Sequence, residues 1–76
     1  MKMTMVGGDW CVFCKKALEL LDSKGIEVEY VDSVQEEERA RKLIQSTGRT
    51  SLPQIWCGEE YVGGYEDLVS YLVEVA

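Results

Sequence analysis

Residues 3–21 read MTMVGGDWCVFCKKALELL, and they place two cysteines between a predicted strand and a predicted helix. The residues before the paired glycines mix polar and apolar positions, which indicates a short strand that begins at Met1. Apolar residues recur at offsets of 0, 3, 4 and 7 from Cys14, which predicts a helix that begins near Cys11 and buries one face. The helix is expected to end at Lys24-Gly25, because glycine often stands just past a helix C-terminus.

The two cysteines stand three positions apart at the start of this helix, a spacing that can close a small disulfide ring. The first cysteine lies where unpaired amide N–H groups and the positive end of the helix dipole converge. Lys15 and Lys16 add positive charge nearby. Both effects favour the thiolate, which is the nucleophilic form of cysteine. We therefore expect Cys11 to attack a disulfide and Cys14, one turn deeper, to resolve the mixed disulfide that forms.

Two other roles for the cysteine pair stay open at this point. A zinc site needs about four ligands, whereas the chain has no histidine and only one further cysteine, Cys57. A structural disulfide would suit a secreted domain, but the N-terminus has no apolar stretch typical of a signal peptide. The position between a strand and a helix favours redox chemistry. Cys57 ends an apolar strand and is expected to be a half-buried filler.

The rest of the chain alternates between strand and helix patterns. Residues 26–31 alternate apolar and acidic side chains, which is typical of a half-exposed strand. Asp32 or Ser33 is expected to cap a second helix that ends at Gly48. Two short strands follow, the first over 54–57, and the final helix has an apolar face formed by Leu68, Tyr71, Leu72 and Val75. This order predicts one mixed sheet flanked by helices.

Composition narrows the class of protein. The 76 residues leave room for one domain, which we expect to cover residues 1–76. Hydrophobic residues make up 46% and charged residues 29%, as in globular proteins, so disorder is not expected. Lys and Arg number 8 against 14 Asp and Glu, and the resulting net charge of −6 argues against a nucleic-acid partner. No apolar run could span a bilayer. We expect a cytoplasmic monomer that binds no membrane.

Three blocks of the sequence resemble the glutaredoxin family. They are CVFCKKA at 11–17, GRTSLPQIW at 48–56 and VGGYEDL at 62–68, and with the element order they cover nearly the whole chain. The resemblance implies an α/β chain with the smallest version of the thioredoxin fold. The expected order is β-α-β-α-β-β-α, with a four-stranded mixed sheet flanked by three helices. It also implies a cis peptide bond before Pro53, which is uncommon in proteins.

The resemblance further implies a thiol–disulfide oxidoreductase that reduces protein disulfides and glutathione mixed disulfides. Glutathione would be the electron donor and co-substrate, with no tightly bound cofactor and no metal. The backbone of Leu52 would pair with the cysteinyl part of the tripeptide like an added strand. The helix that begins after Gly64 would hold the γ-glutamyl carboxylate at its N-terminus. Carried over residue by residue, the glutathione site comprises Phe13, Ser51, Leu52, Pro53, Gly64, Tyr65, Glu66 and Asp67.

The sequence also departs from the family pattern. Gly8 stands where most glutaredoxins carry a Lys or Arg that pairs with the glycine carboxylate of glutathione, and Ala40 stands where a second polar partner is common. Trp10 before the first cysteine is more typical of thioredoxin. These departures support an alternative, a glutaredoxin-like electron donor to ribonucleotide reductase that thioredoxin reductase recharges. Val12, in place of the usual proline, also permits a third role as an iron–sulfur cluster carrier.

Overall fold

The computed structural model describes residues 2–75. Its seven elements are β1 (Lys2–Gly7), α1 (Val12–Ser23), β2 (Glu27–Asp32), α2 (Glu37–Thr47), β3 (Gln54–Cys57), β4 (Glu60–Gly63) and α3 (Tyr65–Val75). This confirms the element order expected from the sequence. Met1, expected to begin the first strand, lies outside the described residues, as does the side chain of Val75.

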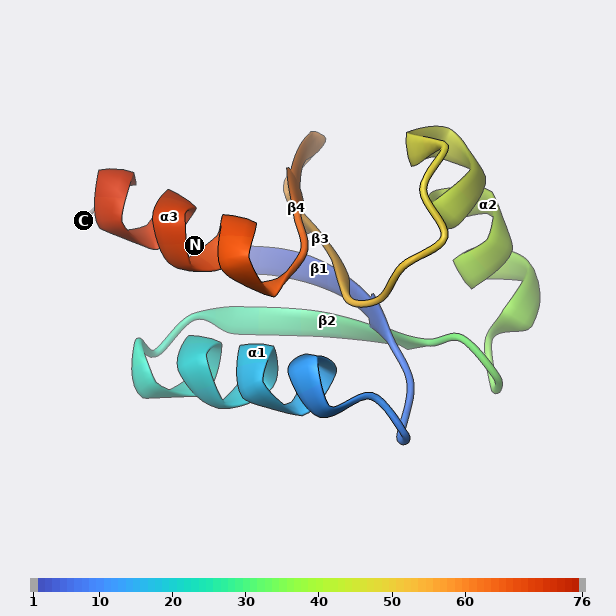
Figure 1. The fold of residues 1–76 in the computed structure, drawn as a ribbon, viewed down its shortest axis with the longest axis horizontal. Helices are drawn as coiled ribbons and strands as arrows, with labels where there is room; N and C mark the ends of the chain where they lie inside the picture. The colour runs from blue at the N-terminus through green and yellow to red at the C-terminus, as the bar shows by residue number, and fades with distance from the viewer. Residues whose placement is uncertain (1, 76) are drawn as a thin grey trace.

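The four strands form one sheet in the order β2-β1-β3-β4 (Figure 1). β1 runs parallel to β2, and Met5 is the register partner of Tyr30. β3 is antiparallel to both β1 and β4, so the sheet is mixed, as expected. The crossover between the two parallel strands is α1, which packs on the sheet that it connects. The fold is thioredoxin-like.

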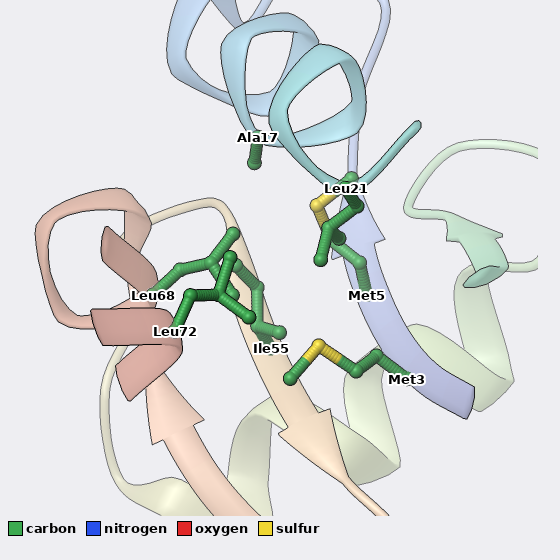
Figure 2. Packing of buried hydrophobic residues seen from close by; sticks show 7 residues of the cluster. All are labelled: Met3, Met5, Ala17, Leu21, Ile55, Leu68 and Leu72. Atoms are coloured by element: carbon green, nitrogen blue, oxygen red, sulfur yellow. The ribbon is translucent and has the colours of Figure 1, made fainter. Parts of the chain in front are cut away.

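One face of the sheet packs against both α1 and α3. Side chains on a strand alternate between the two faces, so Met3 and Met5 of β1 point to the same side. Figure 2 shows the cluster that they form with residues of both helices and of β3. Burying one large apolar side chain stabilises the folded state by roughly 1.5–3 kcal/mol, so this cluster holds the two helices against the sheet. Its buried members are Met3, Met5, Ala17, Leu21, Ile55, Leu68 and Leu72.

α2 covers the other face of the sheet. Val6, Val31 and Trp56 are buried there against Ala40 of the helix. Leu43 and Ile44 of α2 pack against this cluster while keeping part of their surface exposed. At the rim, Arg39 of α2 forms an ion pair with Glu29 of β2.

The start of α2 differs from the expected capping. The Asp32 carboxylate accepts hydrogen bonds from the amides of Val34 and Gln35 at 2.8 and 3.0 Å. These bonds stabilise the turn that precedes the helix, whereas the N-cap residue is Glu36, whose side chain makes no capping bond. The expected end is confirmed, because Gly48 follows the helix with a φ of 72° that favours glycine.

Candidate active site

Cys11 lies at the N-terminus of α1. Its backbone is extended, with φ −89° and ψ 109°, so it is the N-cap residue of the helix. Its Sγ accepts a hydrogen bond from the backbone N–H of Cys14 at 3.2 Å. Sulfur thus occupies the capping position that a serine or aspartate oxygen fills in other helices. A negatively charged sulfur is favoured in this position.

Cys11 and Cys14 are joined by a disulfide, with their Cα atoms 5.2 Å apart. The two sulfurs differ in access, because Cys11 is half-buried and Cys14 is only 1% exposed. An incoming thiol or disulfide therefore reaches Cys11 first. The roles predicted from the sequence, in which Cys11 attacks and Cys14 resolves, require such a difference in access.

The charges around the helix start are mostly positive. The first turn of α1 contains no acidic residue, and Lys15 and Lys16 follow directly, both exposed. The ammonium of Lys16 lies 5.2 Å from the centre of the Phe13 ring, within the range of a cation–π contact. These charges and the helix dipole act in the same direction, towards an anionic Cys11 sulfur.

A groove of about 260 Å³ is formed by Phe13 and by two segments far from it in sequence. One segment is the loop before β3, where the Leu52–Pro53 peptide bond is cis, as expected. The other is the N-terminus of α3, where the Tyr65 ring lies 5.8 Å from the Phe13 ring. The lining residues are Phe13, Ser51, Leu52, Pro53, Gly64, Tyr65 and Glu66.

Asp67 is the one residue of the expected glutathione site that does not line this groove. Its carboxylate accepts a hydrogen bond from the Gly64 amide at 3.0 Å and so caps α3. Gly63 before it has a φ of 124°, and a Cβ on this residue would overlap the Asp67 carboxylate. Because Gly63 has no side chain, the Asp67 carboxylate has room to fold back over the first turn of α3.

Gln54 is a residue of the site that the sequence analysis missed. Its side chain is fully buried at the start of β3. Its amide nitrogen donates to the carbonyls of Arg49 and Ser51 at 2.7 and 3.1 Å, and its oxygen accepts from Thr47 at 2.9 Å. These bonds fasten the loop that carries the cis proline. A polar residue inside an apolar strand was the available signal.

The two departures from the family pattern lie in different surroundings. A Cβ on Gly8 would lie 2.5–2.8 Å from three ring atoms of Trp10, so the indole covers this position. Trp10 itself is 65% exposed. Ala40 is buried against the sheet in the cluster beneath α2, so it belongs to the core.

Cys57 is half-buried and packs against the cluster of Figure 2, as expected for a filler. A hydrogen bond with the Cys57 side chain, together with burial and the Glu60 carboxylate, raises the pKa of Tyr71 to about 12.

In residues 2–75 no three His, Cys, Asp or Glu side chains are grouped so that they could hold a metal ion. Among the helices described, none has the length and apolar character needed to cross a bilayer.

Comparison with known proteins identifies the family. The glutaredoxin family model matches residues 1–62. A glutaredoxin of Pseudomonas aeruginosa is 39% identical over 59 residues, which cover 78% of this chain and 70% of the relative. The chain therefore belongs to the glutaredoxin family, and its Cys11–Cys14 pair makes it a thiol–disulfide oxidoreductase.

Solved structures agree with this assignment. The solution structure of glutaredoxin from Brucella melitensis superimposes with a TM-score of 0.77 at 30% identity, covering 97% of this chain and 80% of that one. The reduced glutaredoxin of Escherichia coli gives a TM-score of 0.79 at 27% identity, covering 97% and 95%.

Proposed function

We propose that the protein is a dithiol glutaredoxin that uses glutathione as its electron donor. The observation that carries this proposal is the groove beside the cysteine loop. Seven of the eight residues that the resemblance assigns to glutathione line it, and the eighth, Asp67, caps the helix that forms one wall. These residues come from three separate segments of the chain, so their convergence is a property of the fold.

In the forward reaction, the Cys11 thiolate attacks a substrate disulfide. A bond forms between Cys11 and one substrate sulfur, and the other substrate sulfur leaves as a thiolate. Cys14 then attacks Cys11, the second substrate sulfur leaves, and the Cys11–Cys14 disulfide forms. One glutathione reopens this disulfide at Cys11, and a second removes the first as oxidised glutathione.

The groove suits the parts of the tripeptide. Leu52 makes no backbone hydrogen bond to the rest of the described chain, so its N–H and C=O are available to an extended peptide. The first-turn amides of α3 lack helical partners and favour a carboxylate. Glu66, which lines the groove there, offers a negative charge to the γ-glutamyl amine.

A coupled assay tests this proposal, with glutathione, glutathione reductase and a glutathionylated peptide as substrate. Turnover is expected, and Glu66→Gln should raise the KM for glutathione about tenfold, as for loss of a charge-assisted hydrogen bond. Glu74→Gln is the matched control, because Glu74 is an exposed acid near the other end of α3. No turnover with glutathione would refute the proposal.

A second candidate function is a donor to ribonucleotide reductase that thioredoxin reductase recharges. The contact of Trp10 with Gly8 favours it, because an aromatic ring covers a position where a cation would bind the glycine carboxylate of glutathione. Supplying reduced nicotinamide cofactor through either glutathione reductase or thioredoxin reductase separates the two functions. Faster recharging of the Cys11–Cys14 disulfide by thioredoxin reductase would favour the second.

A further inference from the structure

The hydroxyl of Tyr30 and the sulfur of Cys14 both border the space that Gly7, having no side chain, leaves open. An ideal Cβ on Gly7 would lie 3.0 Å from Cys14 Sγ and 3.1 Å from both Cε1 and the hydroxyl oxygen of Tyr30. The tyrosine and the resolving cysteine thus approach the same point from β2 and α1. Gly7 ends β1 at this point, and a Cβ there would crowd both side chains.

The environment of Tyr30 keeps its hydroxyl protonated. Burial raises the pKa of Tyr30 above its usual value, and the negative charges of Asp32 and Asp9 raise it further. The side chain is half-buried and packs against the cluster of Figure 2. Within residues 2–75 no hydrogen bond from another group engages this hydroxyl. No protein group described therefore competes for the proton of this hydroxyl.

Opening the disulfide creates an acceptor. When a thiolate attacks Cys11, the Cys11–Cys14 bond breaks and its electron pair remains on Cys14 Sγ. This sulfur is only 1% exposed, so water reaches it poorly and its charge is costly to bury unpaired. The carboxylates that act on Tyr30 are those of Asp32 at the end of β2 and Asp9 in the loop before α1, whereas Lys15 and Lys16 on α1 are exposed.

We propose that the Tyr30 hydroxyl donates a hydrogen bond to Cys14 Sγ as the disulfide opens, and so stabilises the departing thiolate. The tyrosine keeps its own proton, and the electron pair of the broken S–S bond stays on Cys14 Sγ, which accepts the hydrogen bond. The role concerns the exchange chemistry of the cysteine pair and is independent of which reductant attacks. It makes Tyr30 a determinant of how readily the protein is reduced.

The test compares the oxidised protein with Tyr30→Phe, which keeps the ring and removes only the hydroxyl. Dithiothreitol is the reductant: one of its sulfurs bonds to Cys11, and its second sulfur then displaces Cys11 to give the cyclic disulfide. We expect the rate of disulfide opening to fall about tenfold, as for loss of a hydrogen bond to a charged group. The equilibrium with dithiothreitol should shift by a similar factor towards the oxidised protein, about 30 mV in potential.

Tyr61→Phe is the matched control, because Tyr61 of β4 packs against Trp56 of β3 and the variant should change neither quantity. Rates and potentials of Tyr30→Phe equal to those of the unmutated protein would overturn the proposal. A second measurement needs no variant: the Cζ resonance of 13C-labelled Tyr30 should move on reduction of the unmutated protein. The same resonance in both redox states would also overturn it. Because dithiothreitol replaces glutathione, failure of the glutathione proposal leaves this test unaffected.

Discussion

The indole ring of Trp10 lies over the α-carbon of Gly8, close enough that a side chain at position 8 would displace it. The ring belongs to an exposed side chain, so it can swing outwards without disturbing the core. The chain thus carries an aromatic surface beside its reactive cysteine where other family members are expected to carry a cation.

Gly8→Lys tests whether the lack of a cation at position 8 raises the KM for glutathione. We expect the indole to move aside and the KM for glutathione to fall about tenfold, because the ammonium gains a charge-assisted hydrogen bond to the glycine carboxylate. Gly8→Ala is the control, since it displaces the ring without adding charge. An unchanged KM in the lysine variant would mean that another group already binds the carboxylate.

Replacing each reactive cysteine separates the two steps of exchange. Cys11→Ser should abolish all activity, because the more accessible of the two sulfurs, the expected nucleophile, is lost. Cys14→Ser should block reduction of protein disulfides and retain exchange with glutathione mixed disulfides, which needs one thiol. Assays with an insulin-like disulfide substrate and with a glutathionylated peptide measure the two activities. Equal losses in both assays for Cys14→Ser would contradict this division.

Gln54→Glu tests whether the buried amide holds the cis-proline loop. The carboxylate keeps an oxygen for Thr47 and loses the two donated bonds to the carbonyls of Arg49 and Ser51. The variant loses two hydrogen bonds and buries a carboxyl group at a fully buried position, so chemical denaturation should show a loss of about 1–3 kcal/mol. The KM for glutathione should rise as well. Gln45→Glu, an exposed change on α2, serves as the control.

The ion pair between Glu29 and Arg39 predicts a pH dependence of stability. Hydrogen bonding with Arg39, followed by its charge, lowers the pKa of Glu29 below 4.5. The ionised Glu29 therefore stabilises the fold above its pKa in the unfolded chain, and this contribution is lost as pH falls through the lower folded pKa. Melting temperatures between pH 6 and 3 should fall more for the unmutated protein than for Glu29→Gln. Equal slopes would exclude a contribution from the pair.

Much of the fold was predictable because its signals are local. The period of Cys14, Ala17 and Leu21 gives the first helix, and Gly48 marks the end of the second. The groove residues came from resemblance, since composition and periodicity carry no information on which distant segments meet. The cap of α2 was misplaced because the Asp32 carboxylate can accept backbone hydrogen bonds in a turn as well as at the start of a helix. The structure shows that it does so in the turn before α2.

The features that tune the site were harder to foresee. The contact between Trp10 and Gly8 depends on a side-chain rotamer, and the bonds of Gln54 depend on the path of a loop. Tyr30 and Cys14 are far apart in sequence, and they approach the same point beside Gly7 only because β2 lies beside β1. Sequence periodicity indicates which face a residue occupies, and it gives no distance between two such residues.

The groove walls are tied to the packing shown in Figure 2. Phe13 stands one turn before Ala17 on α1, and Tyr65 stands one turn before Leu68 on α3; both buried residues belong to the same cluster. The spacing between the aromatic walls is therefore set by side chains that never meet a substrate. Substitutions at Ala17 or Leu68 in the core could therefore widen or narrow the groove during evolution, with every surface residue unchanged.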